Sequence, residues 1–436
     1  MAYDVIVLGS GPGGYPAAIR ASQLGFKVAI VEKESLGGVC LNWGCIPTKA
    51  LLKSAQVYEY MKHSADYGIS ASNVQHDFGG VVKRSRGVAD KMSKGVTFLM
   101  KKNKIDVIMG YGKVAGKGKL EVTAADGSKQ TVEGKYIVIA TGGRSRVLPS
   151  MPQDGKKIIG YREAMVLPQQ PKSMIVVGSG AIGVEFADFY NSMGTKITIV
   201  EFMPRVVPVE DEDISKELEK QFKKKGIAIM TSAEVTKVDT SGAGVKATVK
   251  TAAGEQVLEA DILLSAAGVV ANIENIGLEE NGIKTDKGRI VVDKYGATSV
   301  PGIYAIGDVA PGQALAHVAS KEGINAAEHI AYMEKKYNHA PEAMDYNNIP
   351  GCTYCSPEIA SVGYTEKAAK EAGYEVKVGK FPFMASGKAS ASGNTDGFVK
   401  VIFDAKYGEF LGAHMIGAGV TELIAEVVVA RKLETT

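Results

Sequence analysis

Residues 3–14 read YDVIVLGSGPGG, and this stretch decides the fold. The run from Tyr3 to Leu8, apolar after Asp4, predicts a buried strand of a parallel sheet. Gly9, Gly11 and Gly14 follow with the spacing G-x-G-x-x-G. Between a strand and a helix, such glycines let the backbone approach a pyrophosphate at the helix N-terminus. The stretch therefore predicts a dinucleotide-binding turn.

The next residues complete this unit. We predict a helix as far as about Leu24, ended by Gly25, and a second strand from Lys27 to Val31. This strand ends at Glu32, where a carboxylate can accept hydrogen bonds from ribose hydroxyls. A lone glycine pattern is a weak signal, but the strand, the helix and the acid together make it a strong one.

The same plan occurs a second time, after a predicted strand at Met174–Val177. The distance from Gly178 to Glu201 is 23 residues, as it is from Gly9 to Glu32. Each half also continues into alternating segments and closes on a strand and a glycine turn, at 112–143 and 235–268. Two such units suggest two different dinucleotides on one chain.

Two cysteines lie between these units, in the stretch GGVCLNWGCIPTKALL at residues 37–52. A disulfide between Cys40 and Cys45 would close a small ring and add little loop-closure stability, so its value would be chemical. Two buried cysteines that happen to be close are the alternative. Lys49 follows four residues later and is either part of this site or a solvated lysine.

Composition limits the class of protein. The chain has 436 residues, enough for two or three domains, and a net charge of 51 − 48 = +3, which does not favour nucleic acid as a partner. No signal peptide and no membrane-spanning run is predicted. Four cysteines fit a reducing compartment, so we expect a cytoplasmic protein whose disulfide is catalytic.

The rest of the chain adds a third unit. Residues 53–104 have a helical pattern, the run Gly302–Asp308 predicts a strand that closes on an acid, and a helix begins near Leu315. From Asp345 the composition changes to short strands and a final helix from about Val420. The predicted fold class is α/β, with two Rossmann-like dinucleotide-binding domains and a C-terminal α+β interface domain; the expected limits are 1–143 with 272–344, 144–271, and 345–436.

Together these motifs resemble the class I pyridine nucleotide-disulfide oxidoreductases, and within them the dihydrolipoamide dehydrogenase family. The resemblance covers essentially the whole chain and rests on the segments GSGPGG, VCLNWGCIPTKALL, IVIATGG, GSGAIGVE, YAIGD and GAHMIGAGVTELIAE. It implies an enzyme that oxidises protein-bound dihydrolipoamide and reduces NAD, through FAD and a redox-active Cys40–Cys45 disulfide. It also implies a homodimer that serves the lipoyl group of an E2 protein or of a glycine-cleavage H protein, with no nucleic acid, membrane or metal.

The resemblance assigns residues to each cofactor. Those expected at FAD are Gly9, Gly11, Gly14, Glu32, Lys49, Gly112, Thr141, Gly142, Gly143, Asp308, Ala314, Leu315, Ala316 and His317. Those expected at NAD are Gly178, Gly180, Gly183, Glu185, Glu201, Val235 and Gly268. A carboxylate at Glu201 repels a 2′-phosphate, which independently favours NAD over NADP.

The resemblance also assigns catalytic roles to Cys40, Cys45, Lys49 and Glu185. Cys40 exchanges with the substrate disulfide, Cys45 faces the flavin, and Lys49 pairs with Glu185. A further thiol-deprotonating histidine is implied in a C-terminal His-Pro segment of the partner subunit, and the printed sequence contains no such segment. We expect that the chain has lost this end, the alternative being a natural short form with weak lipoamide turnover. His317 with Glu322 and His329 with Glu334 have the spacing of that pair, but they should not meet within one helix.

The motifs leave other assignments open. The alternatives are a flavoprotein with NADH diaphorase activity only, a related reductase of the glutathione or mercuric type, and a catalytically silent flavoprotein subunit. Cys352 and Cys355 form a C-x-x-C pattern that invites a redox or metal role, yet ordinary strand residues are the favoured interpretation.

Overall fold

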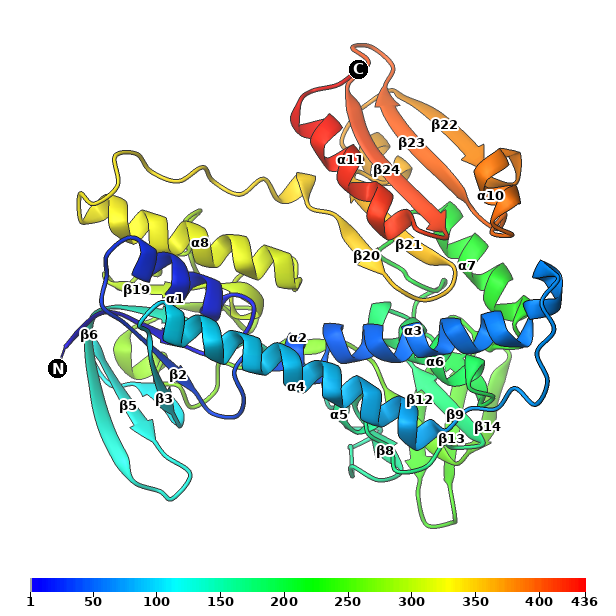
Figure 1. Ribbon diagram of the computed structural model, residues 1–436, viewed down its shortest axis with the longest axis horizontal. Helices are drawn as coiled ribbons and strands as arrows, with labels where there is room; N and C mark the ends of the chain where they lie inside the picture. The colour runs from blue at the N-terminus through cyan, green and yellow to red at the C-terminus, as the bar shows by residue number, and fades with distance from the viewer. Residues whose placement is uncertain (1) are drawn as a thin grey trace. The chain divides into compact units, whose positions relative to one another are not determined.

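A computed structural model describes residues 2–436, which form two compact units (Figure 1). The first unit contains the segment up to Pro47, Ser85–Arg144 and Val269–Tyr346; the second contains Thr48–Arg84, Ser145–Gly268 and Asn347–Thr436. Within residues 2–436, no helix is long and apolar enough to cross a membrane. The three-domain division predicted from the sequence remains a proposal.

The first unit is built on a mainly parallel sheet around the predicted strand β1 (Tyr3–Leu8). Strand β1 pairs in parallel with β2 (Val28–Glu32) on one side and with β6 (Lys129–Ile139) on the other. The strand order is β3-β2-β1-β6-β5-β4, and β19 pairs with β6. The other strands are β3 (Asp106–Met109), β4 (Tyr111–Val114), β5 (Lys119–Thr123), β7 (Gly143–Ser145), β16 (Val269–Ala271), β17 (Thr285–Asp286), β18 (Arg289–Ile290) and β19 (Ile303–Ala305).

Strand β6 differs from the prediction for residues 112–143. The sequence predicted alternating segments followed by a separate buried strand, whereas β6 spans both. Its first half pairs antiparallel with β5, and its second half pairs parallel with β1. Gly134 lies at the change of partner, where an added Cβ would lie 2.7 Å from Cγ1 of Ile6. A glycine at this point lets one continuous strand pass close to β1 and join both parts of the sheet.

Helices α1 (Gly14–Gln23) and α8 (Ala316–Met333) lie side by side in the first unit (Figure 1). Small residues permit this approach, because a Cβ at Gly323 would lie 2.4 Å from the carbonyl oxygen of Gly13. The alanines of both helices join the strands in one apolar core. The unit also contains α2 (Gly38–Trp43), the start of α3 (Cys45–Lys62) and most of α4 (Phe78–Lys102), with short 3₁₀ turns η2 (Glu279–Asn281), η3 (Gly307–Val309) and, at its end, η4 (Tyr346–Asn348).

The second unit repeats the nucleotide-binding plan. Its parallel sheet has the order β11-β10-β9-β15-β8, with β9 (Ser173–Val177) in the place of β1. The predicted internal repeat is therefore confirmed as structure. The other elements are β8 (Ile158–Ile159), β10 (Lys196–Val200), β11 (Ala228–Met230), β15 (Ile262–Ser265), the antiparallel β12 (Glu234–Asp239), β13 (Val245–Thr251) and β14 (Gly254–Ala260), and the helices η1 (Ser64–Tyr67), α5 (Tyr161–Ala164), α6 (Ala181–Ser192) and α7 (Glu212–Lys224).

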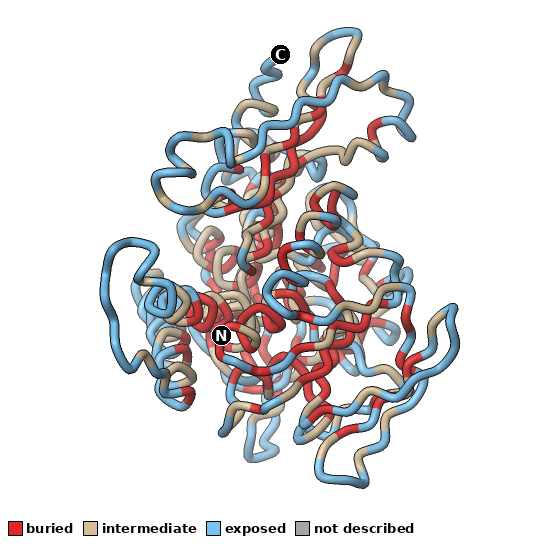
Figure 2. The backbone as a smooth tube through the Cα atoms, turned by 90° about the vertical axis from the view of Figure 1, so that its right-hand side faces the viewer, coloured by how far each residue is buried: buried red, intermediate tan, exposed pale blue. Residues whose placement is uncertain are grey.

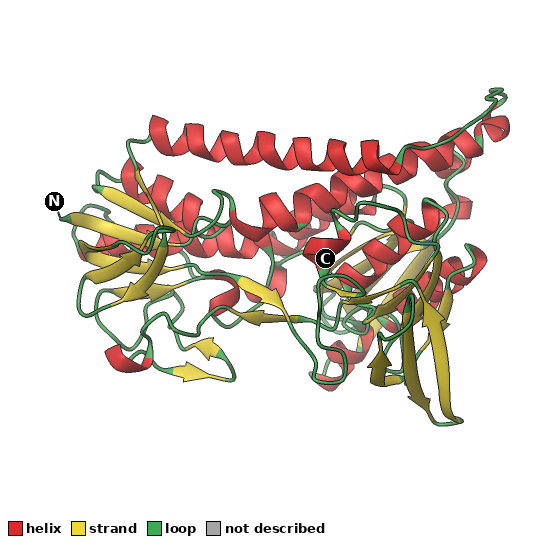
Figure 3. Ribbon diagram, turned by 90° about the horizontal axis from the view of Figure 1, so that it is seen from below, coloured by secondary structure: helices red, strands yellow, loops and turns green. Residues whose placement is uncertain are grey.

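The C-terminal part of the second unit is an antiparallel sheet with the order β20-β21-β24-β23-β22. Helix α11 (Val420–Lys432) packs on β21 and β24 (Figure 1). Figure 2 marks the buried positions along the backbone, and Figure 3 shows helices beside the strands. The remaining bounds are β20 (Gly351–Thr353), β21 (Glu358–Gly363), β22 (Val376–Pro382), β23 (Phe398–Asp404), β24 (Phe410–Gly417), α9 (Glu366–Glu371), η5 (Phe383–Ala385) and α10 (Gly387–Ala391).

A buried acid in this unit predicts a pH dependence of stability. Glu210 is 9% exposed, its Oε2 atom has no hydrogen-bond partner within residues 2–436, and burial raises its pKa to about 7. Because the folded state binds this proton more tightly than the unfolded chain, the stabilisation is present near pH 5 and is lost as the pH rises through 7. The free energy of unfolding of the wild type should therefore fall between pH 5 and pH 8. In the Glu210→Gln variant this fall should be smaller, by up to about 3 kcal/mol.

Thermal unfolding at both pH values measures this effect. Glu255→Gln is the matched control, because Glu255 is exposed on β14. An equal pH dependence of the wild type and the Glu210→Gln variant would contradict the prediction.

Candidate active site

Cys40 and Cys45 form a disulfide, with Cα atoms 4.8 Å apart. Cys40 lies in the short helix α2, and Cys45 is the first residue of α3. This segment packs directly on the first glycine turn, because a Cβ at Gly38 would lie 2.6 Å from Cα of Gly11. The backbone N–H of Gly37 also donates to the carbonyl and the hydroxyl oxygen of Ser10. The chain therefore places a redox-capable bond beside its first dinucleotide turn.

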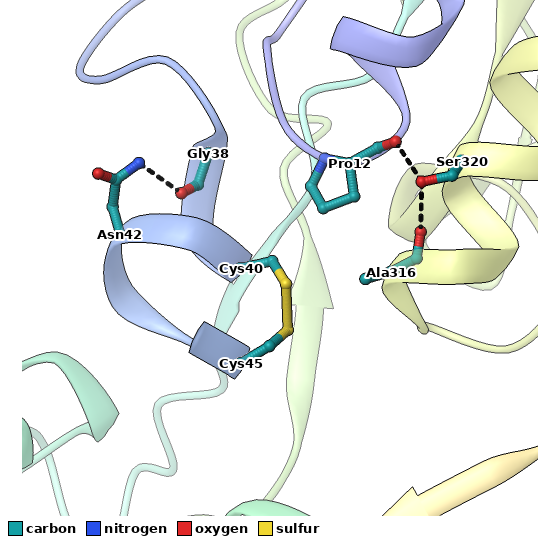
Figure 4. Close-up of a disulfide and its surroundings, with 7 residues drawn as sticks. All are labelled: Pro12, Gly38, Cys40, Asn42, Cys45, Ala316 and Ser320. Carbon is teal, nitrogen blue, oxygen red and sulfur yellow. Dashed lines mark hydrogen bonds between the residues drawn. A yellow bond between two sulfur atoms is a disulfide. The ribbon is translucent and has the colours of Figure 1, made fainter. Parts of the chain in front are cut away.

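Figure 4 shows the residues around this disulfide. The sulfur atoms point to the side on which Pro12 and Ala316 are drawn. Asn42 donates to the carbonyl oxygen of Gly38 at 3.0 Å and so braces helix α2. The Ser320 hydroxyl donates to the carbonyl oxygens of Pro12 and Ala316, at 2.8 and 3.0 Å, and ties α8 to the glycine turn. Sequence reasoning missed both polar residues.

The first glycine turn has the shape that a dinucleotide needs. Gly9 has φ +103°, and a Cβ there would lie 2.3 Å from the carbonyl oxygen of Ala140. A Cβ at Gly14 would lie 1.8 Å from the carbonyl oxygen of Gly9, whereas a Cβ at Gly11 meets nothing closer than 4.0 Å. Gly9 and Gly14 therefore pack tightly against the backbone, whereas Gly11 has free space beside it. At the end of β2, the carboxylate of Glu32 accepts hydrogen bonds from the backbone N–H and the hydroxyl of Ser10 in this turn.

The other residues expected at FAD come from separate parts of the first unit. Thr141 and Gly142 follow β6 and are hydrogen-bonded to Asn272. A Cβ at Gly143 would lie 3.0 Å from Oδ2 of Asp308, so this turn and that acid are neighbours. Gly112 lies in β4, packed against Leu8 of β1. The residues at the start of α8 are Ala314, Leu315, which is its N-cap, Ala316 and His317.

Asp308, the half-buried acid of this group, has a perturbed pKa. Burial raises the pKa of Asp308, and the positive charge of Arg289 opposes that rise. The guanidinium of Arg289 donates to the carbonyl oxygens of Ala310 and Gly312, which holds the segment after Asp308. An acid held in this way presents a hydrogen-bond acceptor for a polar group, such as a sugar-alcohol hydroxyl.

The second glycine turn repeats the first. Gly178 has φ +98°, and a Cβ at Gly183 would lie 1.9 Å from the carbonyl oxygen of Gly178. Gly180 has open space around its Cβ position. Glu201 is 6% exposed and follows β10. Among the other residues expected at NAD, Gly268 accepts a hydrogen bond at its carbonyl oxygen from the backbone N–H of Arg146, and Val235 lies in a buried apolar cluster.

Lys49, Glu185 and Tyr354 form a second polar group, within the second unit. The Lys49 ammonium lies 3.6 Å from the centroid of the Tyr354 ring, and the Tyr354 N–H donates to Oε1 of Glu185 at 2.8 Å. Burial lowers the pKa of Lys49 and raises the pKa of Glu185, and their opposite charges counter both shifts. Lys49 follows Cys45 by one turn of α3. Sequence reasoning named Lys49 and Glu185 but missed Tyr354.

The second cysteine pair has the environment of structural residues. Cys352 lies in β20, and burial raises its pKa to about 11 despite the charge of Lys49. Cys355 is fully buried, and its thiol donates to the carbonyl oxygen of Pro357 at 3.3 Å. Both thiols are therefore protonated at neutral pH. Within residues 2–436, no group of three or more His, Cys, Asp or Glu side chains could hold a metal ion.

Comparison with known proteins agrees with this geometry. Residues 3–323 match the family model described as pyridine nucleotide-disulphide oxidoreductase, and residues 349–436 match the dimerisation domain of that family. The chain belongs to this family. The predicted resemblance and fold class are confirmed.

Relatives of this pyridine nucleotide-disulphide oxidoreductase are similar over the whole chain. The dihydrolipoyl dehydrogenase of Rhizobium etli is 52% identical, covering 100% of this chain and 92% of that protein. The dihydrolipoyl dehydrogenase of Zymomonas mobilis is 49% identical with the same coverage. Among solved structures, LpdA from Mycobacterium tuberculosis has a TM-score of 0.90 at 28% identity, covering 99% of this chain and 94% of that one. Family membership implies the use of flavin and pyridine nucleotide, and the dimerisation domain suggests a homodimer.

Proposed function

We propose that this chain is a dihydrolipoyl dehydrogenase, which oxidises protein-bound dihydrolipoamide to lipoamide and reduces NAD. The observation that carries the proposal is the Cys40–Cys45 disulfide packed on the first dinucleotide turn. The names of its relatives confirm the enzyme class predicted from the sequence.

The disulfide provides a route for thiol oxidation. A substrate thiolate attacks Sγ of Cys40, the Cys40–Cys45 bond breaks, and Cys45 leaves as a thiolate. The second substrate thiol then displaces Cys40, so the substrate leaves as a cyclic disulfide and both cysteines are reduced. Lys49, one turn after Cys45 in α3, supplies a positive charge that favours the Cys45 thiolate. FAD, when bound at the first turn, would supply a two-electron carrier between the cysteine pair and NAD.

Each dinucleotide has a site that fits it. FAD takes the first glycine turn, with Glu32 at its ribose and Asp308 near its ribityl chain. NAD takes the second turn, with Glu201 at its ribose, because a carboxylate accepts hydrogen bonds from a 2′-hydroxyl and repels a 2′-phosphate. The open space at Gly11 and Gly180 supports both assignments.

The partners follow from the same proposal. The substrate is the lipoyl group of an E2 protein or of a glycine-cleavage H protein, reached in the cytoplasm. The active form is a homodimer in which both subunits build each active site.

Turnover with defined substrates tests the function. The FAD-containing protein should oxidise dihydrolipoamide with NAD much faster than with NADP, and it should not reduce glutathione disulfide. Reduction of a dye by NADH, measured in parallel, reports the flavin and NAD sites alone. Dye reduction with no dihydrolipoamide turnover would instead indicate a diaphorase, and NADPH-dependent glutathione disulfide reduction a glutathione-type reductase.

A further inference from the structure

The two ribose-binding acids share a contact that the glycine motif does not require. Ser10 donates its backbone N–H and its hydroxyl to Oε2 of Glu32, at 3.0 and 2.6 Å. Ser179 donates the same two groups to Oε2 of Glu201, both at 2.7 Å. Each serine lies 22 residues before its acid. The same residue type at the same position therefore holds both carboxylates.

A third hydrogen bond also repeats. The Oε1 atom of Glu32 accepts from the backbone N–H of Glu34 at 2.9 Å, and Oε1 of Glu201 accepts from that of Met203 at 2.7 Å. A carboxylate offers roughly four acceptor positions, so these bonds fill three and leave one on Oε1 for a ribose hydroxyl. The plane of each carboxylate is thereby fixed before any nucleotide binds.

The serine hydroxyl is the part of this arrangement that depends on the side chain. A backbone N–H is present whichever of the non-proline residues follows the glycine. Both serines are fully buried, and Glu201 is 6% exposed, so water does not readily replace the hydroxyl. Hydrogen bonds to a charged acceptor are stronger than those between neutral groups.

We propose that Ser179 is a positioning residue for nucleotide choice: its hydroxyl fixes Glu201 in the orientation that accepts a 2′-hydroxyl and excludes a 2′-phosphate. Ser10 has the same part toward Glu32 at the first turn. The proposal rests on the assignment of NAD to the second turn. Without the hydroxyl, Oε2 of Glu201 keeps a single donor, and the carboxylate can turn away from an incoming 2′-phosphate.

Redox-inert probes test this at equilibrium. Calorimetric titration of the FAD-containing protein with ADP-ribose and with 2′-phospho-ADP-ribose gives two dissociation constants for each variant. Ser179→Ala should raise the dissociation constant of ADP-ribose about tenfold. The ratio of the dissociation constant of 2′-phospho-ADP-ribose to that of ADP-ribose should fall by at least the same factor. The matched control is Ser265→Ala, which removes a buried hydroxyl that has no partner within residues 2–436, on the strand next to β9. It should leave both constants unchanged.

The first turn supplies an internal comparison. Ser10→Ala should lower the FAD content of the purified protein and leave the preference for ADP-ribose unchanged. Ser179→Ala should leave the FAD content unchanged and reduce the preference for ADP-ribose. If Ser179→Ala does not fold, Ser179→Gly removes the same hydroxyl and keeps the backbone donor.

The outcomes separate the two proposals. A Ser179→Ala or Ser179→Gly protein that binds both probes like the wild type would overturn the role of the hydroxyl and leave the NAD assignment intact. A wild-type protein that binds neither probe, or that prefers 2′-phospho-ADP-ribose, would overturn the NAD assignment itself and with it the selective role of Ser179.

Discussion

Cys45→Ser protein should lose dihydrolipoamide oxidation by at least about a thousandfold while it still reduces a dye with NADH. Serine is similar to cysteine in size, so the packing of the first residue of α3 is kept. Without Cys45, no Cys40–Cys45 disulfide exists for the substrate thiolate to attack. Dye reduction needs the two dinucleotide sites only, so it reports that the rest of the protein is intact.

Cys40→Ser should lose the same activity for a different reason. This variant keeps a Cys45 thiol but has no sulfur with which the substrate can form its mixed disulfide. If Cys45 faces the flavin, its thiolate gives a long-wavelength absorption band in the Cys40→Ser protein and no band in the Cys45→Ser protein. The reverse pattern would exchange the proposed roles of the two cysteines.

The control for both variants is Cys355→Ser, which changes a buried cysteine outside the disulfide. Its dihydrolipoamide turnover should stay close to that of the wild type. Turnover within about tenfold of wild type in either disulfide variant would show that another group carries the thiol chemistry.

The strands and glycine turns were predictable because their signals are local. The apolar run Val5–Leu8 followed by Gly9 describes β1 and its turn without any other part of the chain. Strand β6 was predicted less well, since its two halves carry different patterns and only the approach of Gly134 to Ile6 shows that they are one strand. The register of a strand depends on partners that lie far away in the sequence.

The site was predictable only in part for the same reason. Glu185 was associated with Lys49 through the family resemblance, because no local pattern connects residues so far apart. Arg86 illustrates what was missed: its guanidinium lies 4.3 Å from the centroid of the Trp43 ring and donates to the carbonyl oxygen of Asn42. Its place in helix α4 gives no sign of that contact.

Lys400 shows a limit of hydrophobic patterning. It occupies an inward position of β23 between Phe398 and Ile402 and is 3% exposed. Burial alone would lower its pKa, but hydrogen bonds to Glu366, Asp211 and Asp213 raise it. The alternation identifies the strand correctly, and only the fold shows why a lysine is tolerated there.

Gly183→Ala and Gly180→Ala should impair the second nucleotide site in different ways. A Cβ at Gly183 would lie 1.9 Å from the carbonyl oxygen of Gly178, so helix α6 must move away from strand β9. We expect a loss of about 3 kcal/mol or more in unfolding free energy, together with the loss of ADP-ribose binding. Gly180 has φ −67° and open space at its Cβ position, so Gly180→Ala should fold like the wild type. Its methyl group would occupy the space that the pyrophosphate needs, and binding should still be lost.

Thermal unfolding and ADP-ribose titration of both variants measure the two effects separately. Gly95→Ala, inside helix α4 and with no atom within 4 Å of its Cβ position, is the control and should be stabilised by about 0.5–1 kcal/mol with unchanged binding. Gly180→Ala protein that binds ADP-ribose like the wild type would mean that the nucleotide does not approach this turn. If the Gly183→Ala protein is as stable as the wild type, helix α6 can move away from β9 without a loss of unfolding free energy. Gly180→Ala should therefore lose binding but keep its stability, because Gly180 leaves space for a ligand. Gly183→Ala should lose both, because Gly183 leaves space for the backbone of the chain itself.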